Sequence, residues 1–406
     1  MRTAISSSPI STRPSRKAVI SPVHSRILNG IREVPAAQWN ALAGDYPFLR
    51  HEFLAALEDS GCVSARGGWM PQHLVLSDAR GLAAAAPLYL KDHSWGEFVF
   101  DFAWARAAGQ RGVPYYPKLL CAVPFTPASG PRLLCRADLP AAVCCQRLLG
   151  AMRERAQASE LSSVHALFLD EPARAACGAE GWLLRRDCHF HWHNRGYRDF
   201  GDFLDGFSAE KRKKARRERR RVLEQGIEFR SLEGGELDDA LIALVHEFHA
   251  NTFIRHGHSP YLNRACFAQL AHTMGPALLV KLALCAGKPV AAAVFLRSAD
   301  TLFGRYWGAD ADYHSLHFET CYYQGIDFCI EHGIRRFEPG TQGEHKIARG
   351  FEPALTWSAH WIGDAVLRRA IASYLDREGE AIDSYAAAAD AHAPFRRGDA
   401  DAAGAS

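Results

Sequence analysis

The residues best suited to acid–base chemistry in this chain are concentrated in one short segment, Glu338–Phe351. Carboxylates and an imidazole can act as bases, while cations can hold a phosphate or stabilise a developing oxyanion. Glycines at 340, 343 and 350 allow the backbone to pass close to a ligand, although turns use glycine for the same freedom. We predict a catalytic centre here, and the alternative is a loop whose ions only pair with each other. The candidate bases are Glu338, Glu344 and His345, and the candidate anion-binding residues are Lys346 and Arg349.

Two aromatic residues stand on a strand that is predicted to face this segment. The strand spans residues 301–308, and Tyr306 and Trp307 are expected to line a substrate channel beside Glu338. Tyr306 is also a candidate proton donor to a leaving group, because a phenol can donate a hydrogen bond as well as accept one.

A basic run lies in the middle of the chain. Residues 209–221 (AEKRKKARRERRR) hold nine basic and two acidic residues, and acidic residues slightly outnumber basic ones in the rest of the sequence. Because cations would surround a helix on every side, we expect no apolar face that packs on a core. The run is either a solvated linker helix or a contact for phosphates, for which Lys213 and Arg217 are the candidates.

Polar and aromatic residues also gather in the first half. Lys91, His93, Glu97 and Asp101 lie along a predicted hairpin, and Pro-containing loops follow at residues 115–118 and 124–127. Such density on loops suits a binding cleft, so we predict that these four residues contact an acceptor substrate. The alternative is a packed surface of tyrosine and tryptophan.

The segment Cys188–His193 (CHFHWH) alternates histidine with apolar residues. As a strand it would project three histidines from one face, which is a spacing that a metal site can use. No carboxylate neighbour suggests a second shell, so we predict no metal site. We instead predict a strand at the domain junction that lines the acceptor cleft through His191, Trp192 and Tyr197.

Length and composition bound the class of protein. At 406 residues the chain exceeds the usual size of one core, which favours two domains. No apolar run approaches the ~20 residues that a membrane helix needs, so we predict no transmembrane segment. The 11 cysteines include no CxxC pair, which fits reduced thiols and a cytoplasmic location.

Two stretches resemble each other and predict a duplicated fold. Each reads as three antiparallel strands with an alanine-rich middle strand and an aromatic third strand, joined by turns that contain Gly or Asp. The alternative is that any two short apolar strands look alike. The predicted strands are His73–Leu76, Leu82–Leu90 and Glu97–Trp104 in the first stretch, and Leu279–Leu284, Pro289–Arg297 and Thr301–Trp307 in the second.

A helix and a short strand follow the second stretch. Ser315 can cap a helix that ends at Gly333, because apolar residues between them recur at helical spacing. The next strand is predicted over residues 335–338.

Several strings closely resemble a bacterial family described as FemAB-like, or as GNAT-type N-acyltransferases with a peptidoglycan-biosynthesis label. The resemblance runs from about Ser25 to Glu378. The strings are GWMP (68–71), PLYLKDHSWGEFVFDFAWA (87–105), YYPKLL (115–120), PFTPASGPRLL (124–134), HWHNRGY (191–197), GRYWG (304–308), LHFETCYYQGI (316–326) and GTQGEHKIARGFEP (340–353).

The resemblance implies an α+β fold of two tandem GNAT-like domains with mixed, mostly antiparallel sheets, and transfer of an acyl or aminoacyl group to an amine. We predict a disordered tail over 1–25, an N-terminal domain over 26–190, a junction strand and basic linker helix over 191–230, a C-terminal domain over 231–390 and a second tail over 391–406. A transit peptide is an alternative for the first tail, but that tail shows no amphipathic helix.

The donor is left open between acyl-CoA, aminoacyl-tRNA and another carrier, with no tightly bound cofactor. GNAT enzymes carry a glycine-rich loop that receives the CoA pyrophosphate, whereas the corresponding residues 308–315 contain Asp310 and Asp312. Carboxylates there would repel phosphate.

We expect an acceptor of the cell-wall precursor type. A second hypothesis is a catalytically silent protein whose basic helix binds nucleic acid or another anionic partner. A metal-dependent hydrolase that uses the histidine strand ranks last.

Overall fold

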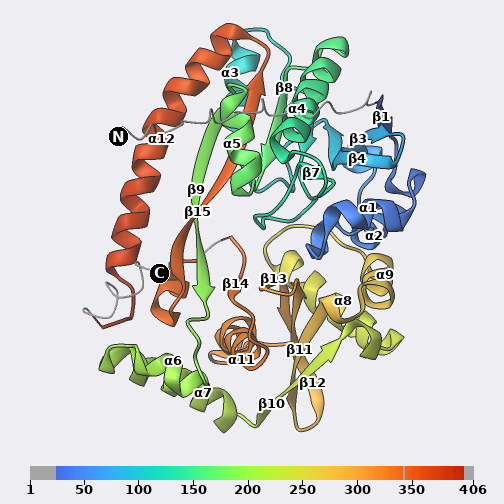
Figure 1. Ribbon diagram of the computed structural model, residues 1–406. Coiled ribbons are helices and arrows are strands. Elements are labelled where there is room, and N and C mark those ends of the chain that lie inside the picture. The colour runs from blue at the N-terminus through green and yellow to red at the C-terminus, as the bar shows by residue number, and fades with distance from the viewer. Residues whose placement is uncertain (1–23, 342, 397–406) are drawn as a thin grey trace, which may run out of the picture.

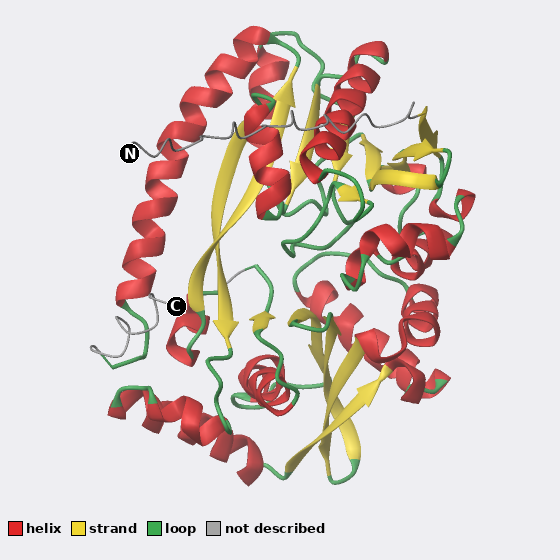
Figure 2. Cartoon of the chain, viewed as in Figure 1, coloured by secondary structure: helices red, strands yellow, loops and turns green. Residues whose placement is uncertain are grey.

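The computed structural model describes residues 24–341 and 343–396, which form alternating strands and helices (Figures 1 and 2). The strands are β1 (His24–Leu28), β2 (Trp69–Pro71), β3 (His73–Asp78), β4 (Gly81–Ala86), β5 (Leu88–Lys91), β6 (Lys118–Cys121), β7 (Leu134–Cys135), β8 (Ser163–Leu167), β9 (Leu183–His193), β10 (Ile227–Glu233), β11 (Leu278–Cys285), β12 (Lys288–Arg297), β13 (Thr301–Ala309), β14 (Arg336–Glu338) and β15 (Glu352–Ile362). The helices are α1 (Ala36–Ala43), α2 (His51–Asp59), α3 (Phe102–Gln110), α4 (Ala141–Ala158), α5 (Glu171–Ala179), α6 (Phe200–Asp205), α7 (Ala209–Glu224), α8 (Asp239–Arg255), α9 (Arg264–Met274), α10 (Leu316–Phe318), α11 (Gln324–Glu331) and α12 (Ala365–Ala391).

The two halves repeat one strand order. In the C-terminal half β10, β11, β12 and β13 pair antiparallel in sequence, and β13 then pairs parallel with β14. In the N-terminal half β1, β3 and β4 pair antiparallel, β5 pairs with β6, and β6 pairs parallel with β8. Each half therefore has the antiparallel-then-parallel order expected of a GNAT-like domain, so the predicted duplication and the tandem α+β class are confirmed.

The halves are joined by an exchange of their last strands. β9 leaves the N-terminal half and pairs with β14, while β15 leaves the C-terminal half and pairs with β8. The two long strands also pair with each other, from Glu352 opposite His191 to His360 opposite Leu183. Figure 1 shows them running side by side between the two halves. One sheet of eleven strands results, and a separate sheet of four holds β1, β3, β4 and β7.

The middle strand predicted over Leu82–Leu90 is broken. Pro87 has no N–H for a ladder, and at this residue the chain passes from β4 in the small sheet to β5 in the large one. In the second half Val294 follows the corresponding alanines, and β12 is continuous; its proline, Pro289, lies near the start of the strand, where it is tolerated.

The third strand predicted over Glu97–Trp104 is wrong. Those residues form a loop and the start of α3, and β6 takes the strand's place in the sheet. The charged residues of this segment are held by side-chain bonds instead of a ladder. The predicted cap residue Ser315 precedes α10, but its hydroxyl makes no capping hydrogen bond.

The cores show how the helices cover the sheet. A shared core joins the two halves: α2 of the first half packs against α9 of the second, and α1 and α8 contribute residues to the same core. A second core lies under α4 and α5, and a third lies under α6 and α11.

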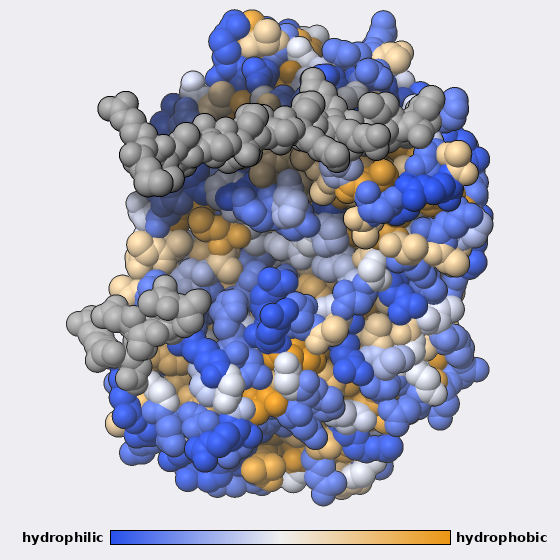
Figure 3. Space-filling model, viewed as in Figure 1, coloured by the Kyte–Doolittle hydropathy of each residue, from blue (hydrophilic) through white to orange (hydrophobic). Residues whose placement is uncertain are grey.

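The basic helix α7 departs from its prediction. It does have a packing face, since Ala215, Glu218 and Val222 are buried at helical spacing. Arg219 on the same side pairs with Glu319 at 3.0 Å and Asp327 at 2.5 Å. The remaining cations are largely exposed, and hydrophilic side chains gather over α6 and α7 at the lower left of Figure 3.

The two predicted tails lie mostly outside the described residues. Where they are described, they are structured: His24 and Ser25 begin β1, and Phe395 bridges to Phe207. In the part of the chain that the structure describes, no helix is long and apolar enough to span a bilayer.

Candidate active site

A loop after β14, residues 339–350, contributes lining residues to two cavities. The larger cavity, about 610 Å³, lies between the halves and is lined by β9, β15 and the loop residues Thr341, Gly343 and Glu344. The smaller, about 170 Å³, lies where β13 and β14 diverge beyond their three paired residues, and Pro339 lines it. We call them the cleft and the splay pocket. One short loop therefore borders both spaces.

The splay pocket holds the predicted channel residues. Tyr306 and Trp307 of β13 line it, together with His317, Cys321 and Tyr322 from the opposite side. The last two belong to a π-helical turn, Glu319–Tyr323, a local irregularity that is frequent at functional sites. Burial raises the pKa of Tyr306, so its hydroxyl stays protonated. Its ring packs against His249 at 4.5 Å and Phe267 at 5.8 Å, on the opposite face of β13 from Trp307.

His345 and Lys346 line neither the cleft nor the splay pocket, but His345 contacts a residue of the splay pocket. The His345 ring nitrogen Nε2 is 2.8 Å from the hydroxyl of Tyr322, which lines the pocket. Lys346 is buried, and its ammonium donates to the carbonyl of Gly340 at 2.6 Å. Burial lowers the pKa of Lys346 to about 7, and no carboxylate of the described residues forms an ion pair with its ammonium. The loop thus holds a cation that can gain or lose its proton near neutral pH.

Glu344, in contrast, lies directly beside a cavity. It lines the cleft, and its carboxylate accepts from the hydroxyl of Tyr385 at 3.2 Å. The same two residues line a third cavity, about 390 Å³, beside Lys211 of α7. The cleft and this cavity therefore meet at the Glu344–Tyr385 pair.

Glu338 is buried at the start of the loop, with 5% of its surface exposed. Burial raises the pKa of Glu338 to about 7, against the opposing charge of Arg336 at 3.2 Å. Its Oε2 accepts a long hydrogen bond from the Ser129 backbone N–H at 3.4 Å and lies 3.8 Å from His191. Its Oε1 has no hydrogen-bond partner among the described residues. This carboxylate is poised to take a proton near neutral pH.

A loop of the N-terminal half, residues 122–130, reaches across to this site. Besides the Ser129 N–H, the carbonyl of Phe125 accepts a hydrogen bond from Arg305 of β13. Gly130 permits the close approach of Tyr46, because a Cβ there would lie 2.4 Å from that ring. The two halves therefore build the surroundings of Glu338 together.

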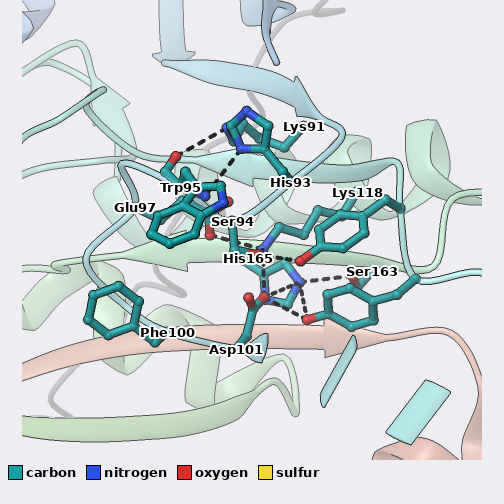
Figure 4. Close-up of polar contacts among 12 residues, drawn as sticks. Lys91, His93, Ser94, Trp95, Glu97, Phe100, Asp101, Lys118, Ser163 and His165 are labelled. Carbon is teal, nitrogen blue, oxygen red and sulfur yellow. Dashed lines mark hydrogen bonds and ion pairs between the residues drawn. The ribbon is translucent and has the colours of Figure 1, made fainter. Parts of the chain in front are cut away.

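Two of the four predicted acceptor residues of the first half, Glu97 and Asp101, belong to a buried cluster around Lys118 (Figure 4). Lys118 Nζ donates to Ser94 at 2.8 Å, Glu97 at 2.9 Å and Asp101 at 2.5 Å. Asp101 also accepts from Tyr115 at 2.6 Å. We call Lys118, Ser94, Glu97 and Asp101 the Lys118 cluster.

The charges of this cluster are buried, and one ammonium pairs with two carboxylates, whose Glu97 Oε1 and Asp101 Oδ1 atoms have no hydrogen-bond partner among the described residues. Burial raises the pKa of Glu97 to about 7, whereas burial of Asp101 is outweighed by Lys118, which leaves its pKa at about 2. Burial lowers the pKa of Lys91 to about 7, and its ammonium lies 4.0 Å from the Trp69 ring. Lys91, Glu97 and Asp101 do not line the cleft, although residues 98–100 between them do. His93 is partly exposed and bonds Lys91 at 3.2 Å. Contact with an acceptor remains a prediction for all four.

A family profile for peptidoglycan biosynthesis and recognition matches residues 30–397. The chain belongs to the FemAB-like family. Membership indicates a transferase of acyl or aminoacyl groups as the general class of activity. Among curated proteins, none matches the chain significantly.

Several solved structures are similar to this FemAB-like chain at low sequence identity. The C-terminal domain of a "Putative Lysylphosphatidylglycerol Synthetase" from Agrobacterium fabrum has 11% identity and a TM-score of 0.50, covering 84% of this chain and 94% of that one. FemX has 12% identity and a TM-score of 0.49, covering 79% and 93%. A tandem GNAT protein from the clavulanic acid pathway has 11% identity and a TM-score of 0.43, covering 84% and 99%.

The remaining predicted residues of the FemAB-like chain are dispersed. Arg349 pairs with Glu218 of α7 at 2.8 Å, so its charge already has a partner, and its contact with a donor remains a prediction. Lys213 and Arg217 are exposed on α7. Trp192 is buried against Tyr197 and Phe203, on the opposite face of β9 from His191.

The histidines of β9 are separate from one another. The rings of His189 and His191 are 6.5 Å apart, and His189 lines the cleft. Burial lowers the pKa of His189 to about 4, so its ring is neutral. Within residues 24–341 and 343–396, no group of three or more His, Cys, Asp or Glu is arranged to hold a metal ion.

The sequence alone did not lead to several residues of the site. Ser129 and Phe125 act through backbone atoms, which leave no signal in residue type. Lys118 did leave a signal, because it opens an apolar run in β6 where a solvated lysine is unexpected. His317 and Cys321 had been placed only as parts of a helix.

Proposed function

We propose that this chain transfers an acyl or aminoacyl group from a carrier to the amine of an acceptor of the cell-wall precursor type. The observation that supports it is the loop 339–350, which borders both the cleft and the splay pocket. A two-substrate transfer needs both substrates beside the same reacting groups, and one loop borders both spaces. The acceptor would lie in the cleft and the activated acyl group in the splay pocket.

Residues of the loop and of the strands beside it have proposed roles. Glu338 takes the amine proton, directly or through one water, because its pKa of about 7 matches neutral operation. Lys346, with His345 and Tyr322, stabilises the oxyanion that forms when the amine attacks the carbonyl. Tyr306 gives a proton to the leaving group as the bond between the acyl carbon and its carrier breaks. Glu344 contacts the acceptor from the cleft.

The residues present are more compatible with aminoacyl-tRNA or a carrier-protein thioester as the donor than with free acyl-CoA. Asp310 and Asp312 are exposed before the three-residue helix α10, where a GNAT enzyme would hold the CoA pyrophosphate. The exposed cations of α7 offer phosphates an alternative, and the cavity beside Lys211 meets the cleft at Glu344.

The test is a search for amide product by mass spectrometry, with aminoacyl-tRNA, acyl carrier protein thioesters and acyl-CoAs as donors and stem-peptide amines as acceptors. Glu344→Ala, His345→Ala and Lys346→Ala should each lower turnover by roughly 10²-fold or more in a folded protein. Turnover near the wild-type rate in all three would place the chemistry elsewhere.

The donor contact has its own test. Replacing Lys213 and Arg217 by Gln should flatten the salt dependence of donor binding, by a log–log slope of about 0.7–0.9 for each lost phosphate contact. If the variant and the wild type showed the same salt dependence, α7 would be a solvated helix that does not contact the donor. Binding of nucleic acid by a protein that forms no amide with any donor would instead support the second hypothesis, a silent binding protein.

A further inference from the structure

In residues 92–102 the polar and charged side chains are buried and the aromatic side chains are exposed, which is the reverse of the usual arrangement. Ser94, Glu97 and Asp101 are at most 4% exposed, whereas Trp95 is 57% exposed, Phe100 51% and Phe102 36%. A soluble protein normally buries large aromatic side chains and solvates carboxylates. Figure 4 shows the Phe100 ring directed away from Asp101 and His165.

The Lys118 cluster fixes this reversed order from beneath. Its ammonium holds Ser94, Glu97 and Asp101 with three hydrogen bonds, so turning the segment over would break all three. Burying charges in this way is costly unless they are paired as they are here. The aromatic side chains are therefore held in solvent by the architecture.

The three rings form one cluster. Trp95 lies 5.3 Å from Phe102, and Phe100 stacks on Phe102 at 5.9 Å with an angle of 19° between the rings. Because the two phenylalanine faces are turned toward each other, they do not offer the open flat face on which a sugar ring would stack. The aromatic cluster is therefore better suited to contact with the apolar region of a lipid bilayer than to stacking on one sugar ring.

A cation lies beside the aromatic cluster. Arg106 is exposed one helical turn after Phe102 and forms no ion pair with any residue that the structure describes. Residues 102–111, which span α3, contain no Asp or Glu. Apolar rings next to an uncompensated cation complement the interface of an anionic bilayer.

We propose that Trp95, Phe100, Phe102 and Arg106 form a peripheral docking surface for an anionic lipid bilayer. The rings insert at the level of the headgroups, and Arg106 contacts their phosphates. Phe100 also lines the cleft, so the docked bilayer would lie at the mouth of the cleft. The proposal stands without the proposed transferase activity, because it concerns binding to lipid alone.

The test is flotation of the full chain with vesicles of equal parts phosphatidylglycerol and phosphatidylcholine, compared with pure phosphatidylcholine. Wild-type protein should float with the anionic vesicles. Trp95→Ser with Phe102→Ser should lower the partition coefficient roughly tenfold or more. Arg106→Gln should lower it roughly fivefold, and on anionic vesicles only.

Two matched controls make the test specific. Leu223→Ser with Ile254→Ser removes apolar side chains that are 66% and 64% exposed elsewhere, and should leave flotation unchanged. Lys213→Gln with Arg217→Gln removes exposed cations of α7 and should retain most of the binding.

Three outcomes overturn the proposal: wild-type protein that floats with neither vesicle, aromatic variants that float like the wild type, or binding lost only in the α7 variant. A wild-type dimer that the aromatic variants convert to a monomer would assign the surface to a second copy of the chain, and would overturn it as well.

Discussion

Glu97 and Glu338 form a matched pair, one in each half of the molecule. Their exposures are 4% and 5%, and burial raises the pKa of each to about 7. Glu97 accepts from Lys118 at 2.9 Å inside a network that also contains Asp101. Glu338 has one long bond from Ser129, and its Arg336 partner is 42% exposed at the side chain.

The same desolvation therefore serves two purposes. In the first half a buried cation compensates the carboxylates and locks a surface segment in place. In the second half Arg336 compensates the charge of Glu338 only weakly, and the adjoining loop borders two cavities. A buried acid with a raised pKa indicates a functional site only when its surroundings leave it free to react.

The largest effect is expected from removal of the cation in the first half. Lys118→Met leaves Glu97 and Asp101 buried without a partner and should lower the free energy of unfolding by about 3–5 kcal/mol. Urea denaturation measures it. Adding Glu97→Gln and Asp101→Asn to the same chain should restore part of the loss, because uncharged amides need no cation. If Lys118→Met alone were as stable as the wild type, Glu97 and Asp101 would not depend on Lys118 for compensation of their charge.

The next effect separates the two glutamates by activity. Glu338→Gln should lower turnover by roughly 10²-fold or more, since an amide cannot act as a base. Glu97→Gln, with the same burial, should stay within a few-fold of the wild type once substrates are identified. Equal losses in both variants would show that burial, and not chemistry, determines the effect.

The pH dependence of stability should show the Glu338 proton directly. Its pKa is raised from 4.5 to about 7, so the folded state holds the proton more tightly than the unfolded state does. The stability contribution is complete below pH 4.5 and is lost as the pH rises through about 7. Between pH 5 and pH 8, unfolding free energy should therefore fall by about 1–3 kcal/mol more in the wild type than in Glu338→Gln. Parallel curves for the two proteins would contradict the raised pKa.

The smallest effect concerns the partner of Glu338. Arg336→Gln removes the opposing charge, so the pKa of Glu338 should rise and the acid limb of kcat/KM should move up by roughly half a unit to one unit. Arg335→Gln is the control, because that neighbouring side chain is 78% exposed and pairs with Asp300 instead. Identical profiles in both variants would remove Glu338 as the titrating group.

Much of the fold was accessible from sequence, and the limits have physical causes. Repeated strand patterns and family strings predicted twin GNAT-like halves. They did not predict the break at Pro87 or the exchange of β9 and β15. Partners such as Phe337 and Trp192 are far apart in the chain, and local periodicity carries no information about them.

The roles of the site residues remain predictions. Tyr306 and Trp307 line the splay pocket, and His345 contacts Tyr322, which also lines it. Glu97 and Asp101 were placed on a strand because aromatic residues alternate around them, yet their contact with Lys118 overrides that pattern. Residue type showed where charge accumulates, but only the structure showed which charges are paired.

The exchanged strands make the two repeats a single cooperative unit. A fragment cut after α7 would leave β8 without β15 beside it, and the other fragment would leave β14 without β9. Each fragment would expose an unpaired strand edge, which is a template for aggregation. Calorimetry of the intact chain should accordingly record one melting transition, and the two fragments should fold only when they are mixed, as complementary parts of one molecule.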